Sequence, residues 1–176
     1  MNKRLTEIVN LLEESRSALL GSVESLSQQQ FDNKTDAESW SVGEILNHLH
    51  VTDTGVTRIL NKQIQRAQNK GIGPDTNEES IAHSLDQYDL TTVKKKIKAP
   101  KGFVPEHGNP KEEVLNLLKT SRSSLMETIG KSSDFDLTQL EFPHPMIGKM
   151  NMYQWILFVD QHERRHTNQL KDVLTA

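Results

Sequence analysis

The chain has 176 residues, 34% of them hydrophobic and 26% charged, so we expect one globular domain over residues 1–176. It contains no cysteine, which excludes disulfides, a thiolate nucleophile and every metal site that needs a cysteine ligand. A net charge of −3 and the lack of a run of ~20 apolar residues argue against nucleic-acid binding and membrane spanning, so we expect a cytoplasmic protein.

Apolar residues at helical spacing predict two long helices in the first part of the chain. The first covers about residues 5–29, and the second begins at Ser41 and continues to about residue 68. Ser41 and Glu44 form the S-x-x-E capping box that is typical of a helix start. The sequence GIGPD that follows ends the second helix, because its glycines and proline do not continue one.

The rest of the chain predicts two more long helices after a long connection. The connection contains a short predicted helix at about 78–87 and a basic stretch from Lys94 to Lys101, which we expect to be solvated. A third helix begins near Pro110 and ends near residue 130, and a fourth covers about 151–174. Strand signals are scarce, so the sequence predicts an all-α four-helix bundle with a long crossover between the second and third helices.

The last predicted helix carries two histidines, His162 and His166, in the sequence HERRH. Residues four apart leave a helix on the same face, with Cβ atoms about 5–6 Å from each other. Both histidines fall inside the apolar stripe of this helix, where an unpaired polar group costs about 1–3 kcal/mol. A single metal ion would satisfy both side chains, whereas a carboxylate or backbone partner for each is the structural alternative.

The second predicted helix offers a third metal ligand in the sequence LNHLH. His48 and His50 lie near opposite edges of its apolar stripe, so periodicity does not choose between them. Asp53 lies closer to the centre of the stripe and suits a metal ligand, a residue that orients one, or a buried ion pair. His107 and His144 belong to predicted loops, where we expect surface positions.

Glu163 directly after His162 also completes the H-E-x-x-H pattern of zinc proteases, in which the glutamate is the general base. Only ten residues follow His166, too few for the downstream ligand of such enzymes, and no edge strand is predicted nearby for a peptide substrate. Gln169, three residues after His166, is a second weak candidate for the site, as a hydrogen-bond partner of a ligand or of bound water.

Two segments resemble the DinB-like superfamily, which includes the YfiT-type proteins grouped as metal-dependent hydrolases. Residues 40–49 read WSVGEILNHL, similar to its W-S-x-x-E-x-L-x-H-L motif, and residues 152–159 followed by HERRH and Gln169 resemble its closing helix. The resemblance extends over almost the whole chain. It implies a four-helix bundle with a long crossover, a possible homodimer, and a divalent metal ion held by His48, His162 and His166.

The same resemblance indicates the class of chemistry but not the substrate. Characterised relatives include transferases and isomerases that use bacillithiol, mycothiol or glutathione, and many others have no known reaction. We therefore expect a metal-dependent enzyme that activates a low-molecular-weight thiol or water toward a small molecule, with a non-enzymatic metal-binding or interaction protein as the alternative. Ligation by imidazoles alone suits Zn, Ni, Fe or Cu and does not select one of them.

Overall fold

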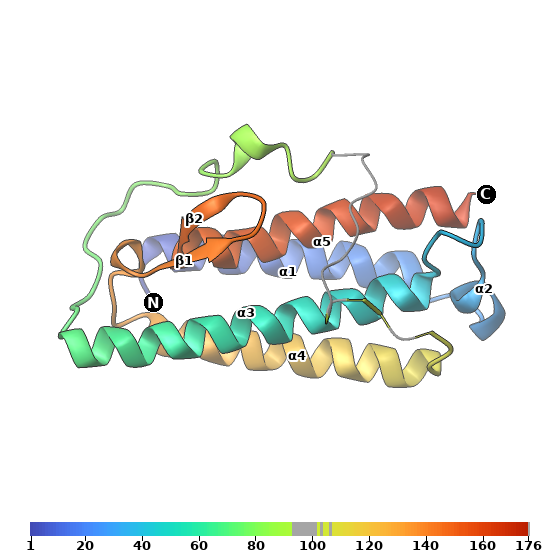
Figure 1. The fold of residues 1–176 in the computed structure, drawn as a ribbon, viewed down its shortest axis with the longest axis horizontal. Helices are drawn as coiled ribbons and strands as arrows, with labels where there is room; N and C mark the ends of the chain where they lie inside the picture. The colour runs from blue at the N-terminus through green and yellow to red at the C-terminus, as the bar shows by residue number, and fades with distance from the viewer. Residues whose placement is uncertain (93–101, 103, 106, 176) are drawn as a thin grey trace.

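Four long helices lie side by side in the computed structural model, which describes residues 1–92, 102, 104, 105 and 107–175 (Figure 1). They are α1 (Lys3–Val23), α3 (Val42–Lys70), α4 (Lys111–Ser132) and α5 (Met152–Leu174). The predicted all-α four-helix bundle is confirmed. The basic stretch from Lys94 to Lys101 lies outside the described residues.

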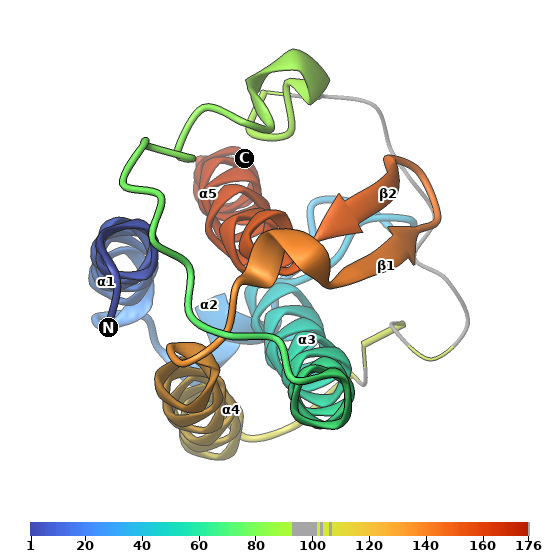
Figure 2. The same cartoon turned by 90° about the vertical axis from the view of Figure 1, so that its left-hand side faces the viewer.

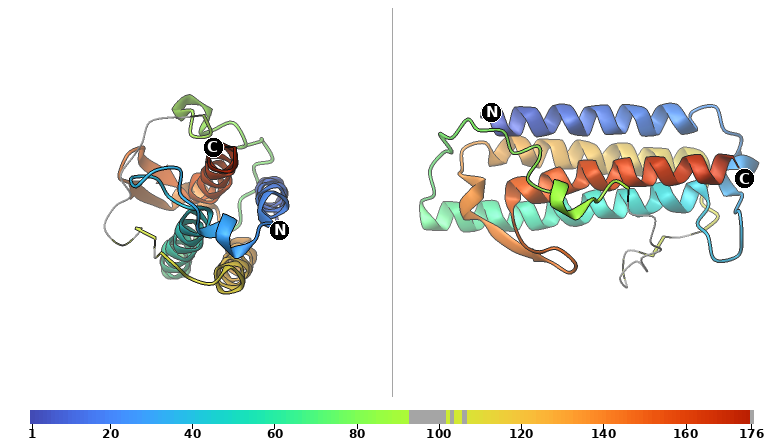
Figure 3. Two further views of the ribbon diagram at one scale, coloured as in Figure 1. Left: turned by 90° about the vertical axis from the view of Figure 1, so that its right-hand side faces the viewer. Right: turned by 90° about the horizontal axis from the view of Figure 1, so that it is seen from above.

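The direction of the helices explains the long crossover. Figure 1 shows that α3 and α4 run in the same direction, so the chain has to return along the bundle between residues 70 and 111. Seen end-on, α5 packs on α1 and α3, and α3 packs on α4 (Figure 2). The view from above confirms that all four axes are close to parallel (Figure 3).

Local side-chain chemistry sets the helix ends. The capping box of Ser41 and Glu44 at the start of α3 is confirmed, and Asn151 with Gln154 forms another at the start of α5. The first helix is shorter than predicted, because α1 ends at Val23 and Ser27 caps a separate short helix, α2 (Gln28–Asp32). Phe31 of α2 packs so closely against Gly43 that a Cβ there would lie 2.7 Å from the ring.

Two local predictions were wrong. A two-stranded antiparallel hairpin, β1 (Glu141–His144) with β2 (Gly148–Asn151), precedes α5. It was not predicted because the prolines of this segment hid the strand signal. The predicted helix at 78–87 is replaced by turns and the 3-10 helix η1 (Asp86–Tyr88); a second, η2 (Leu137–Gln139), precedes β1. Asp75 and Asn77 accept hydrogen bonds from the amides two residues ahead of each, an arrangement that competes with a helix.

The core consists of two apolar clusters separated along the bundle by a layer of buried polar residues. One cluster lies toward the hairpin and the other toward α2. The polar layer crosses each long helix between the two clusters, and its buried members include Ser15, Arg16, Thr52, Asp53, Ser121, Arg122, Asp160, Gln161, Glu163 and His166. Within the described part of the chain, no helix is long and apolar enough to span a membrane.

Candidate metal centre

Three histidines come together on facing sides of α3 and α5. His48, His162 and His166 each offer a ring nitrogen, and these three atoms lie within 4.8 Å of one another. The Nε2 atoms of His48 and His162 are 2.9 Å apart. His48 thus belongs to the histidine cluster, whereas His50 lines a groove between α3 and α4.

One pair of these nitrogens, in His48 and His162, is spaced about as two ligands of a single transition-metal ion are. Two imidazole nitrogens bound to one zinc ion at ~2.0–2.1 Å lie about 3–3.4 Å from each other, close to the separation of His48 from His162. Gln169 fixes the third imidazole, because its Oε1 accepts a hydrogen bond of 2.8 Å from Nδ1 of His166. That bond leaves the lone pair of the third histidine on Nε2, the state that a metal ligand requires.

The surroundings keep the imidazoles of His162 and His166 neutral. Burial, together with the nearby His48 and Arg165, lowers the pKa of His166 to about 3. Burial also holds the pKa of His162 well below its ordinary value, and His166 and His48 add to the effect. His48 and His166 are buried while His162 keeps a partly exposed edge. At neutral pH, His162 and His166 are therefore uncharged, and each has a ring-nitrogen lone pair that can bind a cation without prior loss of a proton.

Aromatic rings enclose the three histidines along α3 and α5. The half-buried Trp40 lies just before α3, with its ring centroid 5.0 Å from that of His48 and stacked at 6.2 Å on His166. On the other side, the ring of Phe158 stacks on His162 at 5.1 Å. Sequence reasoning gave Trp40 no role here, because Trp40 precedes the N-cap Ser41 and helical spacing does not say where its ring lies.

His144 lies at the end of strand β1 and contacts Phe158, whose ring in turn stacks on His162. Its ring is 4.7 Å from Phe158, and burial lowers its pKa. The amides of Met146 and Ile147 donate to its Nδ1, so the strand turn fixes the ring. The prediction of a surface loop was therefore incomplete, since this histidine is half-buried and ordered by the hairpin. His107 does lie in a loop, 3.7 Å from Glu44.

Glu163 points away from the histidines, into the bundle. Its carboxylate accepts hydrogen bonds from Arg16 at 2.7 Å, Arg122 at 2.9 Å and Ser15 at 3.1 Å. Asp53 pairs with the same two arginines, at 3.0 and 3.1 Å. The buried ion pair was one of the roles considered for Asp53, and the structure shows it. Glu163 also forms buried ion pairs, which were not among its predicted roles, and nothing in them supports it as a general base.

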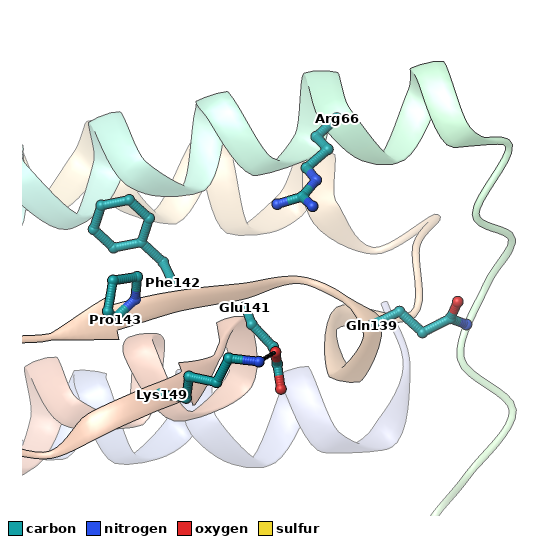
Figure 4. Close-up of a pocket in the computed structure, with 6 residues that line it drawn as sticks. All are labelled: Arg66, Gln139, Glu141, Phe142, Pro143 and Lys149. Carbon is teal, nitrogen blue, oxygen red and sulfur yellow. Dashed lines mark hydrogen bonds and ion pairs between the residues drawn. The ribbon is translucent and has the colours of Figure 1, made fainter.

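Two cavities lie in other parts of the molecule, and none of the three clustered histidines lines either of them. One of about 220 Å³ lies between α3 and the hairpin, lined by Arg66, Gln139, Glu141, Phe142, Pro143 and Lys149 (Figure 4). Its Lys149 and Glu141 form an ion pair of 2.7 Å across the two strands. The α3–α4 groove that holds His50 measures about 430 Å³. Neither cavity gathers side chains that suit a metal.

Comparison with known proteins identifies the family. A model of the DinB superfamily matches residues 11–170. The chain belongs to the DinB superfamily. Its sequence is 26% identical over 169 residues to the uncharacterised protein YuaE of Bacillus subtilis strain 168, covering 94% of this chain and 96% of that protein.

A solved structure supports the same fold. The crystal structure of TT2238, a four-helix bundle protein, matches 96% of this chain and 98% of its own with a TM-score of 0.66 at 21% identity. The similarity predicted from residues 40–49 and the last helix is thus confirmed at the level of family and fold. The descriptions of YuaE and TT2238 name no reaction.

Proposed function

We propose that this DinB-superfamily protein binds one divalent metal ion through His48, His162 and His166 and uses it in small-molecule chemistry. The observation that carries the proposal is the convergence of three ring nitrogens within 4.8 Å in a buried, aromatic setting. Three protein ligands leave further coordination positions open, as in catalytic rather than structural sites. Zn, Ni, Fe and Cu all suit this ligand set.

A bound divalent ion would lower the pKa of a thiol or a water that joins it, which generates a nucleophile at neutral pH. The chain's own residues would bind the ion, orient its ligands and shield the site from water. Gln169 holds the ring of His166 with its Nε2 free to bind, and Trp40 and Phe158 limit the access of bulk water. Because the chain has no cysteine, a nucleophilic thiol has to come from a cosubstrate.

We favour transfer of a low-molecular-weight thiol first and hydrolysis second. A zinc protease is not supported, since Glu163 is bound by Arg16 and Arg122. A metal-binding protein without turnover shares the same geometry and is the second candidate. The cytoplasmic location and the homodimer stay predictions.

The distinguishing experiment compares protein loaded with zinc or nickel with the same protein stripped by a chelator. Each is incubated with glutathione and a chromogenic aryl halide, and separately with an activated ester without thiol. Turnover that requires the metal and is lost in loaded His48→Ala protein would establish the enzyme. Stoichiometric metal binding without turnover in either assay would favour the non-enzymatic candidate.

A further inference from the structure

Four buried charges form a network at the centre of the bundle, with one residue from each long helix. Arg16 comes from α1, Asp53 from α3, Arg122 from α4 and Glu163 from α5. Their side chains are 10%, 2%, 10% and 1% exposed, respectively. With two positive and two negative groups the network is neutral, which is the condition for keeping such charges away from water.

The contacts of the network cross from helix to helix. Each guanidinium bonds both carboxylates: Arg16 lies 3.0 Å from Asp53 and 2.7 Å from Glu163, and Arg122 lies 3.1 and 2.9 Å from the same two acids. The remaining donors also cross between α1 and α4, since Nη1 of Arg16 donates to the carbonyl of Leu118, and Nη1 of Arg122 to that of Leu12, each at 2.9 Å. Hydrogen bonds between ionised groups are the strong ones.

Both acids of the network belong to the helices that carry the histidines. Glu163 directly follows His162, and successive helical residues point about 100° apart, so the two side chains leave α5 on different sides. Asp53 follows His48 by five residues on α3. The two arginines come from α1 and α4, which contribute no histidine to the cluster. The network therefore joins α3 to α5 from inside the bundle, behind the histidines.

We propose that Arg16 and Arg122 are positioning residues of the metal centre. Through Asp53 and Glu163 they fix the rotation and the axial register of α5 against α3, and so bring His162 and His166 to His48. Apolar packing alone tolerates alternative arrangements, whereas a buried charge that shifts loses its partners. This inference rests on the proposed metal site and adds to it the structural reason for its geometry.

The chain offers a matched control for this role. Arg4, also on α1, is 9% exposed and pairs at 3.0 Å with Asp75, which is 5% exposed. This pair lies beside Tyr153 at the start of α5, whereas the histidines lie near the middle of that helix. Arg16→Met thus breaks two buried ion pairs, of 3.0 and 2.7 Å, and Arg4→Met breaks one of 3.0 Å between side chains of similar exposure. A merely structural role predicts the same consequences for the histidines in both variants.

The test titrates Co²⁺ into metal-free wild type, Arg16→Met and Arg4→Met, and records the absorption spectrum of the bound ion and the urea midpoint of each protein. We expect Arg16→Met to raise the Kd by about tenfold or more and to change the spectrum. Arg4→Met is expected to lower the urea midpoint while it keeps the wild-type Kd and spectrum. Wild-type Kd and spectrum in Arg16→Met would overturn the inference.

A milder pair guards against a variant that does not fold. Asp53→Asn keeps the shape of the side chain and Asp75→Asn is its matched control. The histidine ring signals of the metal-free proteins are then compared by NMR. Shifts of His48, His162 and His166 in Asp53→Asn alone support the positioning role, and unchanged signals overturn it. If wild type takes up no Co²⁺, the proposed function fails, while the NMR comparison still decides this inference.

Discussion

Two polar clusters meet on α5, where His162 belongs to one and its neighbour Glu163 to the other. In the charge network, opposite charges bond each other at 2.7 to 3.1 Å. In the histidine cluster, rings that repel one another's protonated forms converge with their nitrogens within 4.8 Å. The opposite charges of the network satisfy one another and hold the helices together. The neutral ring nitrogens of the histidine cluster instead direct their lone pairs to one place, which suits an added cation.

Removing one acid from the charge network is expected to give the largest effect. Glu163→Ala leaves Arg16 and Arg122 with an uncompensated buried charge, which typically costs about 3–5 kcal/mol of the free energy of unfolding. Urea denaturation of the metal-free protein measures it. The control Glu127→Ala breaks an exposed ion pair with Lys131 and is expected to leave the midpoint nearly unchanged. Equal midpoints for the two variants would contradict a closed, stabilising network.

In the histidine cluster, Gln169→Leu is expected to weaken metal binding more than folding. The variant removes the acceptor of the His166 Nδ1 proton, and loss of such an outer partner lowers metal affinity by about 10–100-fold. Competition with a chelator of known affinity measures the change. Lys171→Leu, an exposed position two residues later, is the control. Unchanged affinity in Gln169→Leu would show that the hydrogen bond does not orient a ligand.

Acid is expected to destabilise the metal-free protein through the histidine cluster. The pKa of His166 is about 3 in the folded protein and about 6.5 in the unfolded chain, so the unfolded state binds more protons between these values. Stability is complete above pH 6.5 and falls by about 1.4 kcal/mol per pH unit below it for such a group. Urea midpoints of wild type and His166→Gln across this range measure it. Parallel pH curves for the two proteins would contradict a buried neutral His166.

The sequence predicted most of the bundle because the necessary information is local. Apolar spacing and the Ser41 capping box placed the start of α3, and Asn151 lies where the last helix was expected to begin. The hairpin was missed since its pairing of Glu141 with Asn151 brings together residues that show no strand pattern of their own. The end of α1 was missed because Ser27 starts a new helix where spacing suggested continuation.

The candidate site was predictable only in part, for the same reason. Helical spacing joined His162 to His166, but the choice of His48 over His50 depends on how α3 faces α5. Glu163 shows the limit most clearly. Its local pattern suggested a protease base, while its partner Arg16 lies 147 residues away in the sequence and Arg122 lies 41 residues away. No local pattern shows that two arginines from other helices bind this carboxylate.

The most direct test of the account is the metal content, by mass spectrometry, of untagged wild-type protein beside three single variants. His48→Ala and His166→Ala remove members of the cluster, and His50→Ala is the matched control on the same helix. The account predicts about one equivalent of metal in wild type and in His50→Ala, and its loss in the other two. Wild-type protein that carries no metal and takes up neither added zinc nor nickel would contradict the central claim.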